Sequence, residues 1–370
     1  MIWLIAAMMS CAGMQAQTNL TISQIQEKAV NGDPEGQTLL GKCLLDGNGM
    51  KKDVIEAVRW FNKAAKQDYP EAIYYLGYCH EVGIGMPKSM HDAVDLYKKA
   101  AEAGYVPAMN RLGSCYDAGA EGFDKNYAEA VKWYRRAAEK GNSNAQFNLG
   151  LCYYFFKGVD KLDYAEAVKW WTKSADQGNA TAQLQLAHCY KVGEGVPANA
   201  ERAFTLFRKS ADQGNALAQY EVSNCYRRGT GVPVDEEMSL TYLRKAAEGG
   251  HAPAQYELGK CYDRGTLVEQ DYETAASWYL KAANKDNADA QYNLGNLYFY
   301  GFGVTKDYYE AAKWMEKAAM QEHASAMCGI GICYYYGYGV KRDHAVGRQW
   351  LNRAAAMGDE TAQEVLKQIK

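Results

Sequence analysis

The chain has 370 residues and a formal net charge of −3, with acidic and basic residues interspersed along its length. It has neither the basic stripe that neutralises phosphates nor the polybasic cluster that holds anionic lipid, so nucleic acids and membrane surfaces are disfavoured as partners. Seven prolines against 29 tyrosines are typical of packed helices with aromatic surfaces. No shift in composition marks a domain border, which favours a repeated architecture.

The segment from Met1 to Gly13 is almost wholly apolar, and the first basic residue is Lys28. This segment resembles the apolar region of a signal peptide and is too short to span a bilayer. We predict a signal peptide over residues 1–16, cleaved after Ala16, and a periplasmic or secreted protein. Acylation of Cys11 as a lipid anchor stays open. So does an uncleaved apolar N-terminus on a cytoplasmic protein, because the run lacks a basic flank.

After a lead-in over residues 17–31 that includes a first helix, the chain repeats itself every 36 or 37 residues. The fifth, ninth, twelfth and thirteenth positions are apolar or small, as in Ala254, Leu258, Cys261 and Tyr262. At 100° per residue these positions share one helix face. The sequence predicts an all-α chain of nine helix-turn-helix repeats and a closing half repeat over 358–370. The nine starts are residues 32, 68, 104, 141, 178, 214, 250, 286 and 322.

Glycine marks two places in each repeat. A mid-helix glycine costs roughly 1 kcal/mol against alanine, so its recurrence indicates a helix crossing too close to admit a side chain. Paired glycines close the first helix, as in Gly301-Phe302-Gly303, and an aspartate such as Asp307 begins the second helix. Repeat 7 departs from this turn at Leu267, and repeat 9 has Gly347 in an alanine slot. The mid-helix glycines are Gly41, Gly77, Gly113, Gly150, Gly259, Gly295 and Gly331.

The second helix carries a tryptophan in the same slot of six repeats, beside paired alanines. We predict that this ring is the knob that packs into the neighbouring groove. The six tryptophans are Trp60, Trp133, Trp170, Trp278, Trp314 and Trp350.

The repeat pattern is most complete in repeat 8. Its marker residues are Ala290, Leu294, Gly295, Tyr298, Gly301, Gly303, Val304, Asp307, Ala311, Trp314, Lys317, Ala318 and Ala319. This pattern resembles the Sel-1-like repeat family, a relative of the tetratricopeptide repeats, and the resemblance covers residues 32–370. It implies a right-handed superhelical solenoid whose first helices line a concave, peptide-binding surface. It also implies a non-enzymatic scaffold or adaptor that binds protein or peptide partners.

Cysteine recurs at the twelfth position of eight repeats, and Leu297 takes that position in repeat 8. A slot that accepts cysteine or leucine is an apolar core slot, and neighbouring slots near 10 Å apart exceed the ~7 Å limit for a disulfide. The family's cysteine-rich secreted branch pairs cysteines at other offsets, where this chain has Ala282 and Gln291. Cys328 is an unpaired extra. The eight are Cys43, Cys79, Cys115, Cys152, Cys189, Cys225, Cys261 and Cys333.

No catalytic or metal-binding motif emerges from the remaining residues. The six histidines are scattered, with no His-Glu-x-x-His, no Cys-x-x-Cys and no Ser-x-x-Lys. The paired glycines lack the preceding strand of a nucleotide-binding loop. We therefore predict no cofactor and no enzyme, with an envelope enzyme or cell-wall-binding protein as the alternative.

Positions four, eight, eleven and fifteen of the first helix lie opposite the core and vary between repeats. They include Arg111, Ser114, Glu221, Asn224 and Glu257. Aromatic residues such as Phe156 also end several first helices, and exposed aromatics are typical interface anchors. Sealing contacts between repeats is the alternative role for these rings. The predicted partner-binding residues are Tyr154, Phe155, Phe299, Tyr300, Tyr335, Tyr336, Arg228, Lys260 and Arg264.

Overall fold

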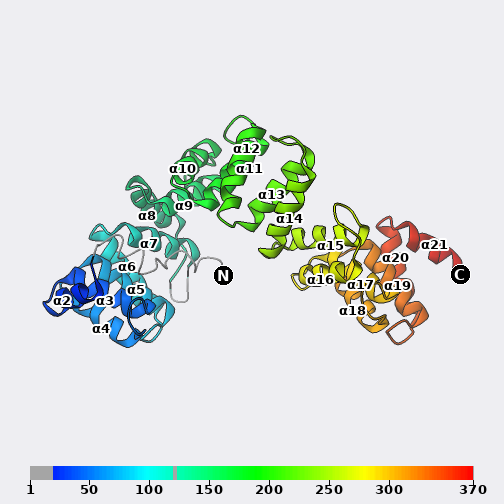
Figure 1. Ribbon diagram of the computed structural model, residues 1–370, viewed down its shortest axis with the longest axis horizontal. Helices are drawn as coiled ribbons and strands as arrows, with labels where there is room; N and C mark the ends of the chain where they lie inside the picture. The colour runs from blue at the N-terminus through cyan, green and yellow to red at the C-terminus, as the bar shows by residue number, and fades with distance from the viewer. Residues whose placement is uncertain (1–19, 120–122, 370) are drawn as a thin grey trace. The chain divides into compact units, whose positions relative to one another are not determined.

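A computed structural model describes residues 20–119 and 123–369, and the regular structure in those ranges is helical. Helix α2 (Ile22–Val30) precedes nine helix pairs, and α21 (Glu360–Gln368) follows them, as Figure 1 shows. The predicted all-α fold of helix-turn-helix repeats is therefore confirmed. The predicted signal peptide and Cys11 lie outside the described residues.

Each repeat consists of a first and a second helix, numbered in chain order. The first helices are α3 (Pro34–Asp46), α5 (Pro70–Val82), α7 (Val106–Ala118), α9 (Ser143–Tyr154), α11 (Ala180–Val192), α13 (Ala216–Arg228), α15 (Ala252–Arg264), α17 (Ala288–Tyr300) and α19 (Ala324–Tyr336). The second helices are α4 (Val54–Ala65), α6 (Met90–Glu102), α8 (Tyr127–Glu139), α10 (Tyr164–Asp176), α12 (Ala200–Asp212), α14 (Glu236–Glu248), α16 (Tyr272–Ala283), α18 (Tyr308–Met320) and α20 (His344–Ala356).

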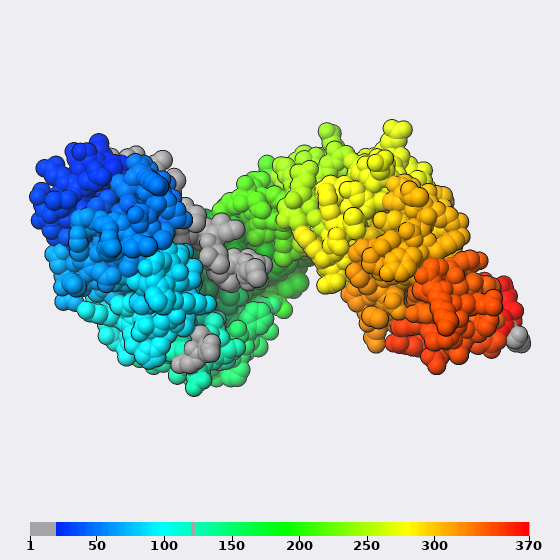
Figure 2. Space-filling model, turned by 90° about the horizontal axis from the view of Figure 1, so that it is seen from below, coloured from blue at the N-terminus to red at the C-terminus, as the bar shows by residue number. Residues whose placement is uncertain are grey.

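The chain divides into two compact units. The first comprises the described residues up to 182 together with 194–196, and the second comprises residues 183–193 and 197–369. Within each unit, a helix packs against the helices that precede and follow it in sequence. Figure 2 shows this order, with blue repeats beside cyan ones and yellow repeats beside orange ones. No helix within residues 20–119 and 123–369 is long and apolar enough to cross a membrane.

The turns follow from local side-chain chemistry. In repeat 8, Gly301 ends α17 with φ 79°, a left-handed conformation that glycine adopts without a steric penalty. The Asp307 carboxylate then accepts hydrogen bonds from two backbone amides at the start of α18. A Cβ on Gly303 would overlap the backbone of Tyr272, so glycine is required there. Leu267, at the corresponding position of repeat 7, adopts φ 65° at a cost of about 1–2 kcal/mol.

The mid-helix glycines face large side chains of the second helix, which confirms the predicted close crossing. A Cβ on Gly259 would lie 2.7 Å from the Tyr279 ring. The facing residue is the one after the tryptophan slot. Trp133, Trp170 and Trp314 are themselves buried in core clusters, as expected of a packed knob. Trp60 and Trp278 are half-buried under the ammonium groups of neighbouring lysines. The buried aromatic rings in the facing slot are Phe61, Tyr97, Tyr134, Trp171, Phe207 and Tyr279.

The twelfth-position cysteines are buried, which confirms the predicted core slot. No disulfide joins Cys79, Cys115, Cys152, Cys225, Cys261 or Cys333. Burial raises the pKa of the Cys79 and Cys333 thiols to about 12, so these groups are protonated at neutral pH. They therefore act as small apolar side chains.

Candidate protein-binding surface

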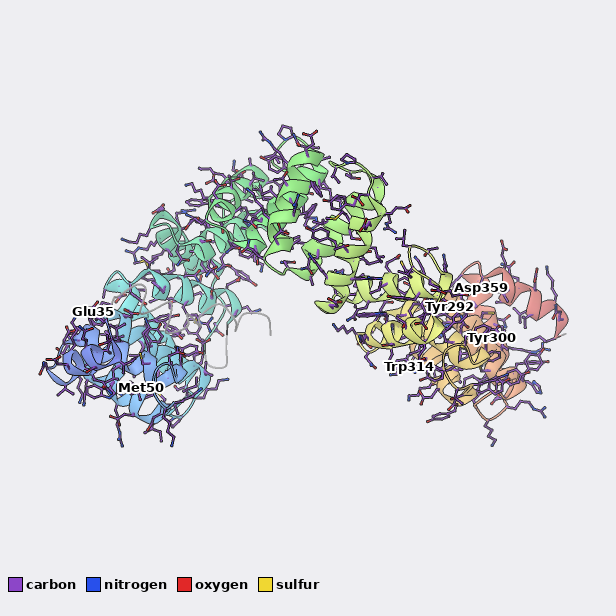
Figure 3. The ribbon with its side chains drawn as sticks, viewed as in Figure 1. Glu35, Met50, Tyr292, Tyr300, Trp314 and Asp359 are labelled. Carbon is purple, nitrogen blue, oxygen red and sulfur yellow. The ribbon has the colours of Figure 1, made fainter. Side chains whose placement is uncertain are left out.

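Aromatic rings gather where first helices end and second helices begin in repeats 7 to 9. We call this cluster the aromatic edge. It consists of Tyr272, Phe299, Tyr300, Phe302, Tyr308, Tyr335, Tyr336 and Tyr338. Tyr300, at the end of α17, is labelled in Figure 3. All eight rings belong to the second unit.

The rings of the aromatic edge form one continuous series of contacts. The Phe302 ring stacks on Tyr272 at 5.1 Å between centroids and on Tyr300 at 5.7 Å. Phe299 contacts Tyr300, Tyr308 and Tyr338 at 5.0–5.6 Å. These separations are within the range of favourable aromatic pairs, each worth about 0.5–1.5 kcal/mol beyond burial. The series therefore holds its outer members in fixed positions.

Three rings of the aromatic edge are open to solvent. Tyr300 is 59% exposed, Tyr336 is 49% exposed and Phe302 is 46% exposed. Phe299 and Tyr308 are half-buried beneath them. Large apolar side chains that are both exposed and rigidly supported are suited to anchoring a partner, because little conformational entropy is lost on binding.

The predicted aromatic residues separate into two groups. Tyr300, Tyr336 and Phe155 are exposed. Tyr154, by contrast, packs 5.2 Å from the Trp171 ring, and its hydroxyl donates to Glu194 at 2.6 Å. Phe299 and Tyr335 are half-buried as well, and the Tyr335 ring lies 4.5 Å from His344. Some of the predicted rings are therefore exposed, as an anchoring role requires, and others make contacts inside the repeat stack.

Phe302 and Tyr338 belong to the aromatic edge but were not among the predicted partner-binding residues. Each stands between the two glycines of its turn, a position treated as a spacer. An aromatic residue there in two successive repeats was the available signal. Phe302 stacks on Tyr272 of the preceding repeat, and Tyr338 likewise contacts Phe299. Turn residues therefore bridge neighbouring repeats along this edge.

The first-helix stripe opposite the core is not a free polar surface at positions eight and eleven. Its charged side chains pair with charges on the neighbouring first helix or within their own helix. Lys260 lies 3.0 Å from Glu257 and is half-buried. Ser114 accepts a hydrogen bond from the Tyr134 hydroxyl. The ion pairs between successive first helices are Lys42–Glu71 at 2.9 Å, Arg111–Glu81 at 2.8 Å, Lys191–Glu221 at 2.8 Å and Arg227–Glu257 at 3.9 Å.

The fifteenth position differs from its neighbours. Arg228 and Arg264 occupy it in repeats 6 and 7, are exposed, and form no ion pair with any described residue. Tyr300 and Tyr336 occupy the same position in repeats 8 and 9. Two predicted cationic residues and two predicted aromatic residues therefore occupy the same repeat position in successive repeats of the second unit.

A pocket of about 270 Å³ lies between repeats 6 and 7, and an open pocket of about 810 Å³ is lined by residues of repeats 2 to 4. Charged side chains that line them form ion pairs with one another, as Glu257 does with Lys260 in the first pocket and Glu81 does with Arg111 in the second. No group of three histidine, cysteine, aspartate or glutamate side chains in residues 20–119 and 123–369 is placed to hold a metal ion. The geometry therefore directs attention to the exposed edge rather than to an enclosed site.

A helical repeat protein with an exposed aromatic edge belongs to the class of proteins that present extended surfaces to partners. The family model described as Sel1 repeat matches nine segments, so the chain belongs to the Sel1 repeat family, whose members generally mediate protein–protein interaction. Each segment starts two residues after the start assigned from the sequence. The segments are 34–69, 70–105, 106–142, 143–179, 180–215, 216–251, 252–287, 288–323 and 324–359.

Solved structures similar to this chain include the following two. One is c5321, a protective antigen of uropathogenic Escherichia coli strains, at 32% identity over 94% of this chain and 89% of that chain, with a TM-score of 0.56. The other is a Sel1 repeat protein from Oxalobacter formigenes, at 31% identity over 86% of this chain and 92% of that chain, with a TM-score of 0.62. No curated protein matches the chain.

Proposed function

We propose that this protein is a non-enzymatic scaffold or adaptor that binds peptide or protein segments through the aromatic edge. The observation that carries the proposal is the exposure of Tyr300, Phe302 and Tyr336 on a layer of half-buried rings. Such rings bury large apolar area on binding and are the side chains that most often dominate interface energetics. Membership of a family that mediates protein–protein interaction supports the same function.

The other predicted residues have supporting roles in this proposal. Arg228 and Arg264 extend the surface with unpaired positive charge. Phe299 and Tyr335 support the exposed rings of Tyr300 and Tyr336, and Lys260 contributes a half-buried charge paired with Glu257. In the first unit, Phe155 provides a separate exposed ring, supported by a contact at 4.9 Å with Tyr154.

The test is affinity capture from envelope extracts with the full chain. The double variant Tyr300→Ala with Tyr336→Ala should retain at least about tenfold less of the specific partner, since truncating a central aromatic anchor typically costs 2 kcal/mol or more. The matched control is Tyr309→Ala, because Tyr309 is 65% exposed in the same repeat but outside the aromatic edge. Equal capture of every partner by the double variant and the wild type would refute the proposal.

We also propose that the protein acts outside the cytoplasm. The apolar segment from Met1 to Gly13 supports export. Mass spectrometry of the cellular protein distinguishes the possibilities. An N-terminus at Gln17 would support cleavage after Ala16, acylated Cys11 would support a lipid anchor, and an intact Met1 segment in the cytoplasm would contradict export.

A further inference from the structure

The fifteenth position of the first helix forms a column along the second unit. Its members are Val192, Arg228, Arg264, Tyr300 and Tyr336, one from each of repeats 5 to 9. All five side chains are exposed. The column therefore presents one apolar residue, two cations and two aromatic rings in a fixed order, one per repeat.

The two arginines of this column differ from the neighbouring charged residues because neither forms an ion pair with a described residue. The adjacent Arg227 pairs with Glu257, which also binds Lys260 at 3.0 Å. Neither Arg228 nor Arg264 has an acidic partner within the described chain. An uncompensated guanidinium at a surface favours carboxylates, which it can bind in a bidentate manner. The column thus has charge complementarity with an acidic segment.

The spacing of the column matches one backbone conformation of a ligand. Ion pairs such as Arg227–Glu257 at 3.9 Å join successive first helices. Helices whose side chains are in contact lie about 8–10 Å apart, which sets the expected separation of successive column residues. A polyproline II helix rises about 3.1 Å per residue and has three residues per turn, so every third side chain points the same way about 9.3 Å further along. Such a helix would present one side chain to each repeat.

The aromatic half of the column favours the same conformation. Polyproline II segments dock on rows of exposed aromatic rings, and their unpaired backbone carbonyls can accept hydrogen bonds from tyrosine hydroxyl groups. Tyr300 and Tyr336 supply both rings and hydroxyls, with Phe302 stacked beside Tyr300 at 5.7 Å.

We infer that the column binds an extended, polyproline II peptide in which two acidic residues three positions apart lie beside two prolines with the same spacing. The acidic residues contact Arg228 and Arg264, and the prolines pack on Tyr300 and Tyr336. This inference rests on the proposed function and specifies the chemistry of the partner. The peptide can run along the column in either direction, because every third side chain of a polyproline II helix points the same way whichever end comes first.

The experiment uses the full chain and fluorescein-labelled peptides in an anisotropy titration. One peptide has the pattern Glu-x-x-Glu-x-x-Pro-x-x-Pro, and a second has the reverse order. A third has the same composition in scrambled spacing, and a fourth places the same residues seven apart in a helical sequence. One of the first two should bind at least about tenfold more tightly than the last two, with an affinity that falls as salt is added.

Two variants locate the binding site. Arg228→Glu with Arg264→Glu should weaken binding by at least about tenfold, as should Tyr300→Ala with Tyr336→Ala. Arg208→Glu with Lys209→Glu, on second helix α12, makes the same change in net charge and should leave the affinity within about twofold.

The inference is overturned if the scrambled or helical peptide binds as tightly as the patterned ones. It is also overturned if both charge-reversed variants lose affinity equally. If captured partners still require Tyr300 and Tyr336 while the three-residue pattern shows no preference, the ligand conformation is wrong and the proposed function stands. If captured partners are also indifferent to those tyrosines, both proposals fail.

Discussion

At the scale of single residues, a buried glutamine at the sixth position links consecutive helices. Its amide nitrogen donates to a backbone carbonyl at the end of the preceding helix, as from Gln291 to Ala283 at 3.1 Å. Its amide oxygen accepts from a glutamine in the last position of the same repeat, as from Gln321 at 2.8 Å. A buried amide is costly unless both ends are paired, and four of the six repeats with this glutamine have both members of the pair. The sixth-position set is Gln37, Gln146, Gln183, Gln219, Gln255 and Gln291.

Repeat 7 lacks the second member of this pair. Lys285 occupies the last position and donates to the Gly250 carbonyl, while the buried Gln255 Oε1 has no partner among the described residues. In repeat 1, Gln67 donates at 3.0 Å both to the Gly32 carbonyl and to Gln37. We therefore expect Lys285→Gln to raise the free energy of unfolding by about 1 kcal/mol, measured by urea denaturation.

The chain offers a matched control for this change. Lys140 also ends a repeat, but Met109 occupies the sixth position there and has no amide to satisfy. Lys140→Gln should therefore leave the unfolding midpoint unchanged within about 0.5 kcal/mol. Equal shifts in the two variants, or no shift for Lys285→Gln, would contradict a role for the unpaired amide.

At the scale of helices, a glycine of the first helix packs against a large residue of the second helix in seven of the nine repeats. In repeat 7, Gly259 faces Tyr279, whose hydroxyl donates to Asp263 at 3.0 Å. In repeat 6 the corresponding residues are Ser223 and Leu243, and Ser223 instead exchanges hydrogen bonds with Ser239. The point where the two helices of a repeat cross is therefore filled by an aromatic ring in repeat 7 and by a hydrogen-bonded serine pair in repeat 6.

Gly259→Ala should destabilise the protein despite the better helix propensity of alanine. Overpacking against the fully buried Tyr279 ring costs about 1–3 kcal/mol, whereas propensity returns about 1 kcal/mol. Adding Tyr279→Leu, which narrows the facing side chain, should make the double variant more stable than the sum of the single changes. Thermal unfolding of the wild type, the two single variants and the double variant measures this coupling. If the two single effects simply add in the double variant, the proposed contact is contradicted.

The helix-turn-helix repeats followed from the sequence because each depends on local signals. Apolar spacing, an aspartate, asparagine or serine at the start of the second helix and a glycine after most first helices recur along the chain. Local signals could not predict which of two adjacent aromatic side chains is exposed and which is covered. Phe299 and Tyr300 are adjacent and both lie off the core stripe, and Phe299 is covered only because Tyr308 and Tyr338 pack on it. That contact depends on the next repeat.

The glutamine pair, by contrast, was available in the sequence. A glutamine ends the repeat in four of the six repeats with a sixth-position glutamine, and in none of the other three. Where the sixth residue is Ile73, Met109 or Met327, the last position holds alanine, lysine or methionine. Paired occurrence across repeats therefore carried information about tertiary contacts that single-helix periodicity does not contain.

At the scale of the whole molecule, the two helices of a repeat pack against each other, and within each unit the second helix also packs against the first helix of the next repeat. Buried residues form successive clusters along the chain rather than one central core. Stability is then approximately a sum of repeat terms and interface terms between adjacent repeats. A local defect should loosen its own surroundings and leave distant repeats protected.

Tyr279→Ala tests this expectation, because the ring is fully buried in repeat 7 and its loss should cost about 3–5 kcal/mol. Native-state hydrogen exchange should accelerate in α13 to α18, which surround the defect, whereas α3 to α8 keep wild-type protection. Tyr309→Ala removes an exposed ring of the same type and should leave exchange unchanged in both regions. Equal acceleration in α3 to α8 would mean that the repeats unfold together, and stability could not then be assigned to neighbouring pairs.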